Sequence, residues 1–249
     1  MAGHNKWSKV KHIKEKVDAK KGKVFSKLSR ELTLAAKSGG DPDMNPRLRS
    51  AILAAKAVNM PSDNIERAIK KGTGELAGDV LEEALYEGFG PGGVALLVEV
   101  VTDNKNRSLG DIRTTLNKNG GSIGSSGSVS FLFERKGEIK LPAAAGSEDA
   151  IMELAMDAGA DDVASDPDEH TILTAPDKLY AVCSHLKEKG STPETVRLVY
   201  LPQNCIQITD AATAAQVLRV CDALDDLDDT QNVFGNFDIP DEILEQLNT

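Results

Sequence analysis

The chain has 249 residues, of which 40% are hydrophobic, only 4% are aromatic and 27% are charged, and its formal net charge is −10. No apolar run approaches the ~20 residues that a membrane-spanning helix requires, and residues 1–10 lack the apolar segment of a signal peptide. The three cysteines are widely spaced without a C-x-x-C pair, which argues against a disulfide framework and against a zinc site. We therefore expect a soluble, cytoplasmic protein of one to three domains with no membrane partner.

The charge is distributed unevenly along the chain. Residues 1–75 contain 17 Lys and Arg against 8 Asp and Glu, whereas the remainder contains 12 against 31. An acidic protein repels a polyanion, but screening over about 8 Å at physiological salt lets a basic surface act independently of a distant acidic one. The N-terminal segment is therefore where we expect contacts with nucleic acid.

Residues 23–37 have the periodicity of an amphipathic helix, with apolar side chains on one side and a basic stripe opposite them. The stripe consists of Lys23, Lys27, Arg30 and Lys37. We expect this helix to bury its apolar side in a small bundle and to leave the basic stripe free.

Two shorter helices are predicted to complete the bundle. Asn45 is followed by Pro46, and an Asn cap with Pro at the first helical position is a preferred helix start. Ser62 is in position to cap the next helix, and Gly72 is expected to supply the left-handed residue that ends it. Residues 1–75 are therefore predicted to form a three-helix domain preceded by a basic arm.

The arm is dense in lysine, with eight between residues 6 and 23, and Trp7 and His12 lie among them. Lysines neutralise phosphates and release counterions, and a tryptophan can stack on an unpaired base. Too few apolar residues occur here to hold a helix folded by itself, so we expect an arm that becomes ordered on binding. A solvated charge run is the alternative interpretation, but the lysine density and the adjoining basic helix favour a polyanion partner.

The predicted nucleic-acid-binding residues are Lys6, Trp7, Lys9, Lys11, His12, Lys14, Lys20, Lys21, Lys23, Lys27, Arg30 and Lys37. A second group either extends this surface or consists of ordinary surface charges: Arg47, Arg49, Arg67, Lys70 and Lys71. No Arg, Asn or Gln cluster stands at the start of a helix in a pattern that reads base edges. Sequence-specific readout is therefore not predicted from these residues.

After a glycine-rich hinge at 72–78 the pattern changes to alternating strands and helices. Residues 94–101 are apolar nearly throughout, as in a central strand covered on both faces, and a helix at 107–119 and a strand at 129–133 follow. Residues 138–201 then read strand, helix, strand, strand, helix, strand, which is the ferredoxin-like order. The strands predicted after residue 202 need a sheet with which to pair, and we expect them to return to the sheet of the second domain.

These patterns predict an α+β multidomain fold, with an N-terminal three-helix domain and two ferredoxin-like α+β domains, one inserted in the other. The predicted boundaries are 1–75 for the arm and bundle, 76–136 with 203–249 for the second domain, and 137–202 for the inserted domain.

The other sequence motifs predict no catalytic, metal-binding or cofactor-binding site. The glycine-rich segment 88–93 lacks the Gly-Lys-Ser/Thr ending of a phosphate-binding loop and precedes a strand, which favours a turn. The glycine and serine segment 120–127 is interpreted as a connector, and the four aspartates between 225 and 229 as a solvated acidic face. No nucleophile with a base, no metal-ligand spacing and no cofactor motif is found, so we predict a non-enzymatic protein without a cofactor or small-molecule substrate.

Seven segments together resemble the YebC/PmpR family: MAGHNKWSKVKH, DAKKGKVFSKLSREL, DPDMNPRLR, NMPSDNIERAIKKGTG, YEGFGPGGVA, TDNKNRS and GGSIGSSGSVSFLF. The resemblance implies a three-domain protein. It also implies a cytoplasmic DNA-binding transcriptional regulator. Mitochondrial relatives in this family are translational activators, related to that of cytochrome oxidase, and bacterial members have been tied to ribosomes translating proline-rich stretches.

Two functions follow as hypotheses. The first is a DNA-binding transcriptional regulator that uses the arm and helix on the phosphate backbone. The alternative is a ribosome-associated or RNA-associated translation factor, which the same basic arm and the missing base-reading helix also suit. The positive charge predicts a polyanion partner without choosing between duplex DNA and the ribosome.

Overall fold

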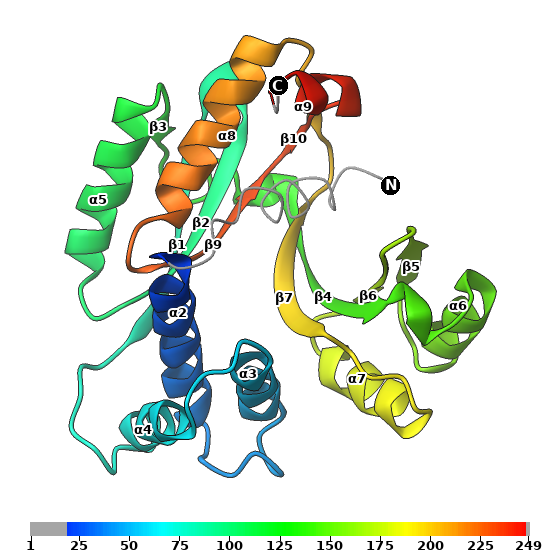
Figure 1. Ribbon diagram of the computed structural model, residues 1–249. Coiled ribbons are helices and arrows are strands. Elements are labelled where there is room, and N and C mark those ends of the chain that lie inside the picture. The colour runs from blue at the N-terminus through cyan, green and yellow to red at the C-terminus, as the bar shows by residue number, and fades with distance from the viewer. Residues whose placement is uncertain (1–18, 248–249) are drawn as a thin grey trace.

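The computed structural model describes residues 19–247, with side chains from residue 22 onward (Figure 1). It begins with a bundle of three helices, α2 (Ala19–Ala36), α3 (Pro46–Ala57) and α4 (Ser62–Thr73). The bundle core consists mainly of Leu32, Ala35, Leu48, Ala55, Ile65 and Ala68. Asn45 caps α3 as predicted, because its side chain accepts a hydrogen bond from the Leu48 amide.

The ends of α4 differ from the prediction. Ser62 is the first residue of the helix and makes no capping hydrogen bond, and Pro61 precedes it. The left-handed residue at the end of α4 is Gly74, with φ 82°, rather than Gly72. Gly72 lies inside the helix, where a Cβ atom would lie 2.2 Å from the Thr33 carbonyl oxygen. The glycine is therefore needed for the close approach of α4 to α2 instead of for a turn.

Replacing Gly72 by alanine is expected to lower the free energy of unfolding by about 2–3 kcal/mol, because the new methyl group must push α2 and α4 apart. Gly22→Ala is the matched control within a helix, since no atom lies within 4 Å of its Cβ position. That control should leave the protein unchanged or stabilise it by up to about 1 kcal/mol. Urea unfolding measures both, and equal stabilities of the two variants would contradict the close approach.

A four-stranded antiparallel sheet follows the bundle, in the order β3-β1-β2-β9. Its strands are β1 (Glu82–Phe89), β2 (Ala95–Thr102), β3 (Ser122–Ile123) and β9 (Thr230–Gly235). Helices α5 (Lys105–Lys118) and α8 (Ala211–Asp225) cover one face of it (Figure 1). Alternate residues of β2 lie in cores on opposite faces, so this strand is buried on both sides as its sequence predicts.

The chain leaves this sheet after β3 and returns to it with β9. The sheet therefore combines strands from both sides of a long intervening segment. Short elements complete this part: β8 (Ile206–Gln207) paired in parallel with β10 (Phe237–Asp238), helix α9 (Asp241–Leu247), and 3₁₀ turns at Pro91–Gly93 and Ser130–Leu132.

The intervening segment forms a second four-stranded antiparallel sheet in the ferredoxin-like order β5-β6-β4-β7. Its strands are β4 (Phe133–Pro142), β5 (Asp162–Ser165), β6 (Glu169–Thr174) and β7 (Thr195–Pro202). A 3₁₀ turn at Ala143–Ala145 follows β4, and α6 (Glu148–Asp157) and α7 (Leu179–Glu188) complete the unit. In the first sheet, by contrast, the two central strands β1 and β2 are joined directly as a hairpin.

Strand β4 corrects one prediction. The two strands expected at 129–133 and 138–141 are replaced by one continuous strand that starts at Phe133. Gly137 lies between the two expected strands, and it pairs with Thr174 on one side and Leu198 on the other. A Cβ atom there would lie 2.3 Å from the Thr174 hydroxyl oxygen. The glycine thus permits close packing within the strand.

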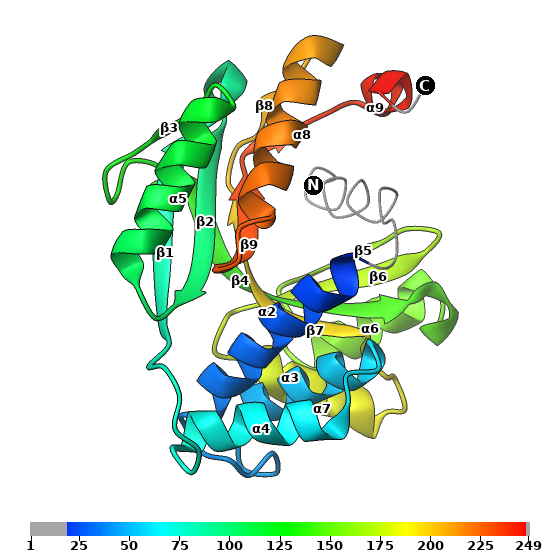
Figure 2. The same cartoon turned by 60° about the vertical axis from the view of Figure 1, so that its left-hand side comes forward.

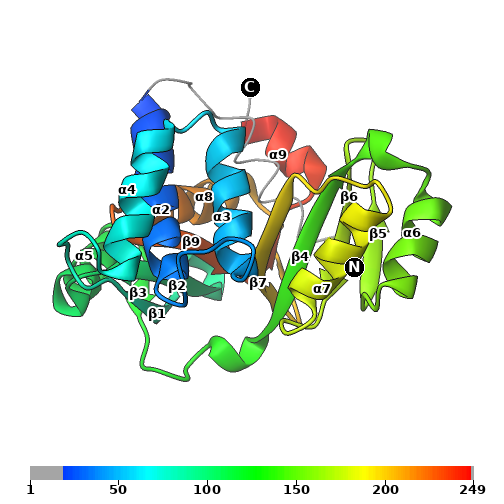
Figure 3. The ribbon, with the colours of Figure 1, turned by 90° about the horizontal axis from the view of Figure 1, so that it is seen from below.

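The helical bundle lies beside both sheets, and α2 runs toward the end of α8 (Figure 2). Seen from below, α3 lies next to β7 (Figure 3). Arg47 of α3 links the bundle to the first sheet, with its Nε 2.8 Å from Glu31 and its Nη2 2.6 Å from Glu83 of β1. The orientation of the bundle is therefore held by polar contacts as well as by packing.

Candidate nucleic-acid interface

The basic side chains of the α2 stripe contact other parts of the protein, although Lys23 and Lys37 are still exposed to solvent. Lys23 Nζ lies 2.8 Å from an Asp226 carboxylate oxygen, and Lys27 Nζ lies 2.8 Å from Asp225. Lys37 donates a hydrogen bond to the Leu81 carbonyl oxygen. The expectation that the stripe is free is therefore wrong, because the acidic segment that follows α8 lies against it.

The end of α8 explains why lysines are placed there. This helix has no basic residue in its last turn and ends in Asp225 and Asp226, so negative charge accumulates at the negative end of its dipole. Lys23 Nζ also donates to the Asp226 carbonyl oxygen at 3.1 Å, and Lys27 Nζ to the Gln231 carbonyl oxygen at 3.3 Å. The α2 lysines therefore supply the positive charge that α8 lacks.

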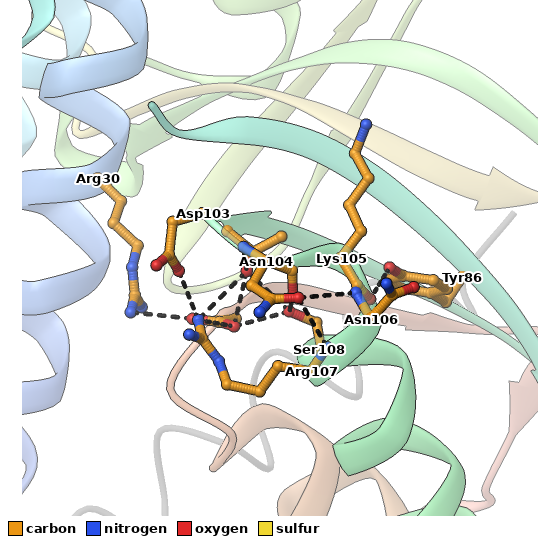
Figure 4. Close-up of polar contacts among 10 residues, drawn as sticks. Arg30, Tyr86, Asp103, Asn104, Lys105, Asn106, Arg107 and Ser108 are labelled. Atoms are coloured by element: carbon orange, nitrogen blue, oxygen red, sulfur yellow. Dashed lines mark hydrogen bonds and ion pairs between the residues drawn. The ribbon is translucent and has the colours of Figure 1, made fainter. Parts of the chain in front are cut away.

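Asp229 is the most heavily bonded of these aspartates, and it is buried. One oxygen accepts from Arg30 Nη2 at 3.1 Å. The other accepts from Ser108 Oγ at 2.7 Å, Arg107 Nη2 at 2.8 Å and Thr102 Oγ1 at 2.9 Å. Figure 4 shows Arg30 approaching from α2, with Arg107 and Ser108 on another side. Asp229 therefore joins the helical bundle to the first sheet and to α5.

Burial alone would raise the pKa of the Asp229 carboxyl group, but the hydrogen bonds from Ser108, Arg107 and Thr102 outweigh it and hold the pKa below its usual value. The interpretation of residues 225–229 as a solvated acidic face is thus wrong for Asp229. Four donors from three elements converge on this one carboxylate, and its charge is compensated by two arginines.

The segment between β2 and α5 is shaped to supply these donors. Asn104 caps α5 by accepting hydrogen bonds from the amides of Asn106 and Arg107. The cap turns the first helical residues so that Arg107 also reaches Asp103 at 2.6 Å. The Tyr86 hydroxyl donates to the Lys105 carbonyl oxygen at 2.8 Å, which ties the same turn to β1 (Figure 4).

Two hollows border the α2 contacts. The first, about 340 Å³, lies at the Asp229 cluster between α2, α5 and the end of α8. The second, about 350 Å³, lies between α2 and α4 and is lined by polar and basic side chains that include Ser29, Arg30, Asn64, Arg67 and Lys71. Arg30 borders both hollows.

The predicted site residues are divided by the structure. Six of them, Lys6, Trp7, Lys9, Lys11, His12 and Lys14, lie outside the described residues. Lys20 and Lys21 lie in the first turn of α2, whereas Lys23, Lys27, Arg30 and Lys37 make the contacts given above. Arg67 and Lys71 are brought together at the second hollow. Their spacing of four residues in a helix was the signal that could have singled them out from the other surface charges.

Comparison with known proteins gives a consistent result. The model of the TACO1/YebC protein N-terminal domain matches residues 5–75, and that of the TACO1/YebC second and third domain matches residues 81–237. The chain belongs to the TACO1/YebC family.

Its relatives match over nearly the whole length. A probable transcriptional regulatory protein of Akkermansia muciniphila is 56% identical over 250 residues, covering 99% of this chain and 100% of the relative. One of Aquifex aeolicus is 49% identical over 248 residues, covering 99% and 100%. The crystal structure of a conserved hypothetical protein, Aq1575, from Aquifex aeolicus has a TM-score of 0.85 at 49% identity, covering 92% of this chain and 95% of that one.

The segments that resemble the YebC/PmpR family meet in space. The TDNKNRS segment supplies three donors to Asp229, and the DAKKGKVFSKLSREL segment, most of which lies in α2, supplies Arg30. Glu87 of the YEGFGPGGVA segment accepts hydrogen bonds from the backbone amides of Gly127, Val129 and Ser130 in the glycine and serine segment. The first set of contacts holds α2 against the first sheet, and the second ties the glycine and serine segment to β1.

Residues 19–247, which the structure describes, contain neither a candidate metal site nor a candidate membrane span. No group of three or more His, Cys, Asp or Glu side chains there is placed to hold a metal ion. Within the same residues, no helix has both the length and the apolar composition needed to cross a membrane.

Proposed function

We propose that this protein is a non-enzymatic DNA-binding transcriptional regulator that acts in the cytoplasm. The observation that carries the proposal is the segregation of charge, with 17 Lys and Arg against 8 Asp and Glu in residues 1–75 of an otherwise acidic chain. The relatives named probable transcriptional regulatory proteins support the regulatory role.

The arm makes the first phosphate contacts in this proposal. Lys23, Lys27 and Arg30 are already paired with carboxylates. For a phosphate to replace these partners, it must displace Asp226, Asp225 or Asp229. The remaining lysines of the predicted set are Lys6, Lys9, Lys11 and Lys14 in the arm, Lys20 and Lys21 in the first turn of α2, and Lys37. Binding through them neutralises phosphates without reading bases, so affinity depends strongly on salt and weakly on sequence.

The test is the salt dependence of binding to a fluorescent 30-base-pair duplex, measured by anisotropy. Replacing Lys9, Lys11 and Lys14 by alanine should reduce the slope of log K against log salt by about 2–3, because each phosphate contact contributes about 0.9. The control replaces three exposed lysines outside the bundle, Lys118 at the end of α5 and Lys178 and Lys189 at the two ends of α7, and should leave the slope unchanged.

Two outcomes overturn the proposal. One is the absence of saturable DNA binding by the unaltered protein at physiological salt. The other is an equal slope for the arm variant and the unaltered protein. RNA of the same sequence is measured in parallel, and binding at least tenfold tighter than to DNA would favour the ribosome-associated or RNA-associated alternative.

A further inference from the structure

We propose that the hollow between α2 and α4 is a binding site for the backbone phosphates of duplex DNA, with Arg67 and Lys71 as its cations. The inference rests on the proposed function and adds a phosphate site within the folded part of the chain. The hollow has a volume of about 350 Å³, and the lining side chains that can donate to a phosphate are Ser29, Arg30, Asn64, Arg67 and Lys71.

Arg67 and Lys71 differ from the α2 cations in having no carboxylate partner. Among residues 19–247, neither forms an ion pair, and both side chains are exposed. By contrast, the α2 cations Lys23, Lys27 and Arg30 are each within 3.1 Å of a carboxylate oxygen. Positive charge is therefore available to an external anion at α4 and is already neutralised along much of α2.

The spacing of the pair suits a nucleic-acid backbone. Residues four apart in a helix lie on the same side and are separated by about 6 Å along its axis. Phosphates along one strand of B-DNA advance by about 3.4 Å per nucleotide. Arg67 and Lys71 can therefore contact phosphates one or two nucleotides apart, with Arg67 offering paired donors and Lys71 a point charge.

The walls of the hollow are held in place by contacts between the two helices. Thr33 Oγ1 of α2 lies 3.1 Å from the Ala68 carbonyl oxygen of α4 and 2.8 Å from the Ser29 carbonyl oxygen. Gly72 allows the helices to approach so closely that a side chain at its position would collide with Thr33. The cations of α4 are therefore mounted on a fixed surface, which lowers the entropic cost of binding.

Arg30 lies at the inner wall, but its charge is already paired. Its Nη2 contacts Asp229 at 3.1 Å, whereas its Nη1 is buried and has no hydrogen-bond partner among the described residues. A phosphate in the hollow would reach this second nitrogen only after the side chain moves, so Arg67 and Lys71 remain the cations of the site. One carboxylate opposes the cations, that of Asp79, which is exposed on the segment between α4 and β1. Removal of this charge should strengthen phosphate binding.

The experiment compares three variants of the full chain with the unaltered protein on a fluorescent 30-base-pair duplex over a range of salt. Arg67→Ala/Lys71→Ala should lower affinity at 150 mM salt at least tenfold and reduce the salt slope by about 2, because two phosphate contacts are lost. Asp79→Asn should raise affinity about two- to threefold. Arg113→Ala/Lys118→Ala removes the same charge from exposed positions on α5 and should change affinity less than twofold.

Each outcome decides a different point. If the unaltered protein binds and the α4 variant behaves like the α5 variant, the site is wrong while the proposed function survives. If the unaltered protein does not bind DNA, the proposed function fails and the site with it. Unchanged urea unfolding shows that the α4 variant is folded, and the single variants Arg67→Gln and Lys71→Gln replace it if it is not.

Inorganic phosphate, added at constant ionic strength, tests the size of the ligand. The site as proposed takes several linked phosphates, so phosphate at about 10 mM, well below the physiological ionic strength of about 0.15 M, should compete weakly. Strong competition that disappears in the α4 variant would assign the hollow to a small free anion and overturn the assignment to DNA. An RNA duplex of the same sequence is the last comparison. If it binds as tightly as the DNA and depends on Arg67 and Lys71 to the same extent, the assignment of the site to DNA is overturned.

Discussion

Replacing Asp229 by alanine is expected to lower the free energy of unfolding by about 2–4 kcal/mol, because two arginines and two hydroxyl groups lose their shared acceptor. The carboxylate is buried, and its donors come from α2, from the end of β2 and from α5. Its removal leaves Arg30 with no carboxylate at 3.1 Å and removes one of the contacts that hold α2 against the first sheet. Urea unfolding measures the loss.

The matched control for this prediction is the adjacent residue. Asp228 is exposed and borders the same hollow, so Asp228→Ala removes the same charge without breaking the cluster. It should change stability by less than about 0.5 kcal/mol. Asp229→Asn keeps the shape and one acceptor and should fall between the two. Similar stabilities for the two alanine variants would show that the cluster does not hold the bundle in place.

Glu87→Gln is expected to lower the free energy of unfolding by about 2–3 kcal/mol, because an amide NH₂ would face backbone N–H groups where a carboxylate oxygen now accepts them. Glu87 is buried, and its Oε1 lies 2.6 Å from the Gly127 amide nitrogen. Its Oε2 lies 2.6 Å from that of Val129 and 2.9 Å from that of Ser130. Hydrogen exchange should show lost protection at these three amides.

Glu82→Gln on the same strand is the control, because this side chain is exposed and pairs only with Lys105 at the surface. It should leave exchange at residues 127–130 unchanged. If the Glu87 variant exchanges no faster than the Glu82 variant, the glycine and serine segment is held by something other than this carboxylate.

Protonation of Glu87 at low pH should weaken the same three hydrogen bonds that Glu87→Gln weakens. Burial acts to raise the pKa of this carboxyl group, but the three backbone hydrogen bonds outweigh it and place the pKa below its ordinary value. A lowered pKa in the folded protein contributes stability above the unfolded value of about 4.3. This stability is lost as the pH falls below that value and through the folded pKa. The stability difference between the unaltered protein and Glu87→Gln should therefore narrow below about pH 4.

The sequence predicts most of the local structure of this protein. The cap at Asn45, the apolar run that became β2 and the order of strands and helices along the ferredoxin-like unit all follow from local chemistry and periodicity. The breaks between elements were the main source of error. Gly72 was expected to end a helix, and the strands at 129–133 and 138–141 were expected to be separate, but Gly72 and Gly137 both allow close packing against residues distant in the chain. Such contacts leave no mark in the local pattern.

The same limit applies to the candidate site. The periodicity of α2 identifies a basic stripe correctly, yet it cannot show that Asp225, Asp226 and Asp229 lie against it, about 200 residues further along the chain. An acidic run and a basic run predict solvated surfaces when each is considered alone. Their pairing depends on how the bundle is placed against the first sheet, which is a property of the tertiary fold.

This pairing has a consequence for the thermodynamics of binding. A lysine that leaves an internal carboxylate for a phosphate still releases cations from the DNA, but the freed carboxylate attracts cations in turn, so the net release per contact is smaller. In the proposed DNA complex, contacts made through Lys23 and Lys27 should therefore depend less on salt than contacts made through unpaired cations. The acidic end of α8 would therefore compete with an external polyanion for the cations of α2. Only a polyanion of high charge density would displace the three aspartates.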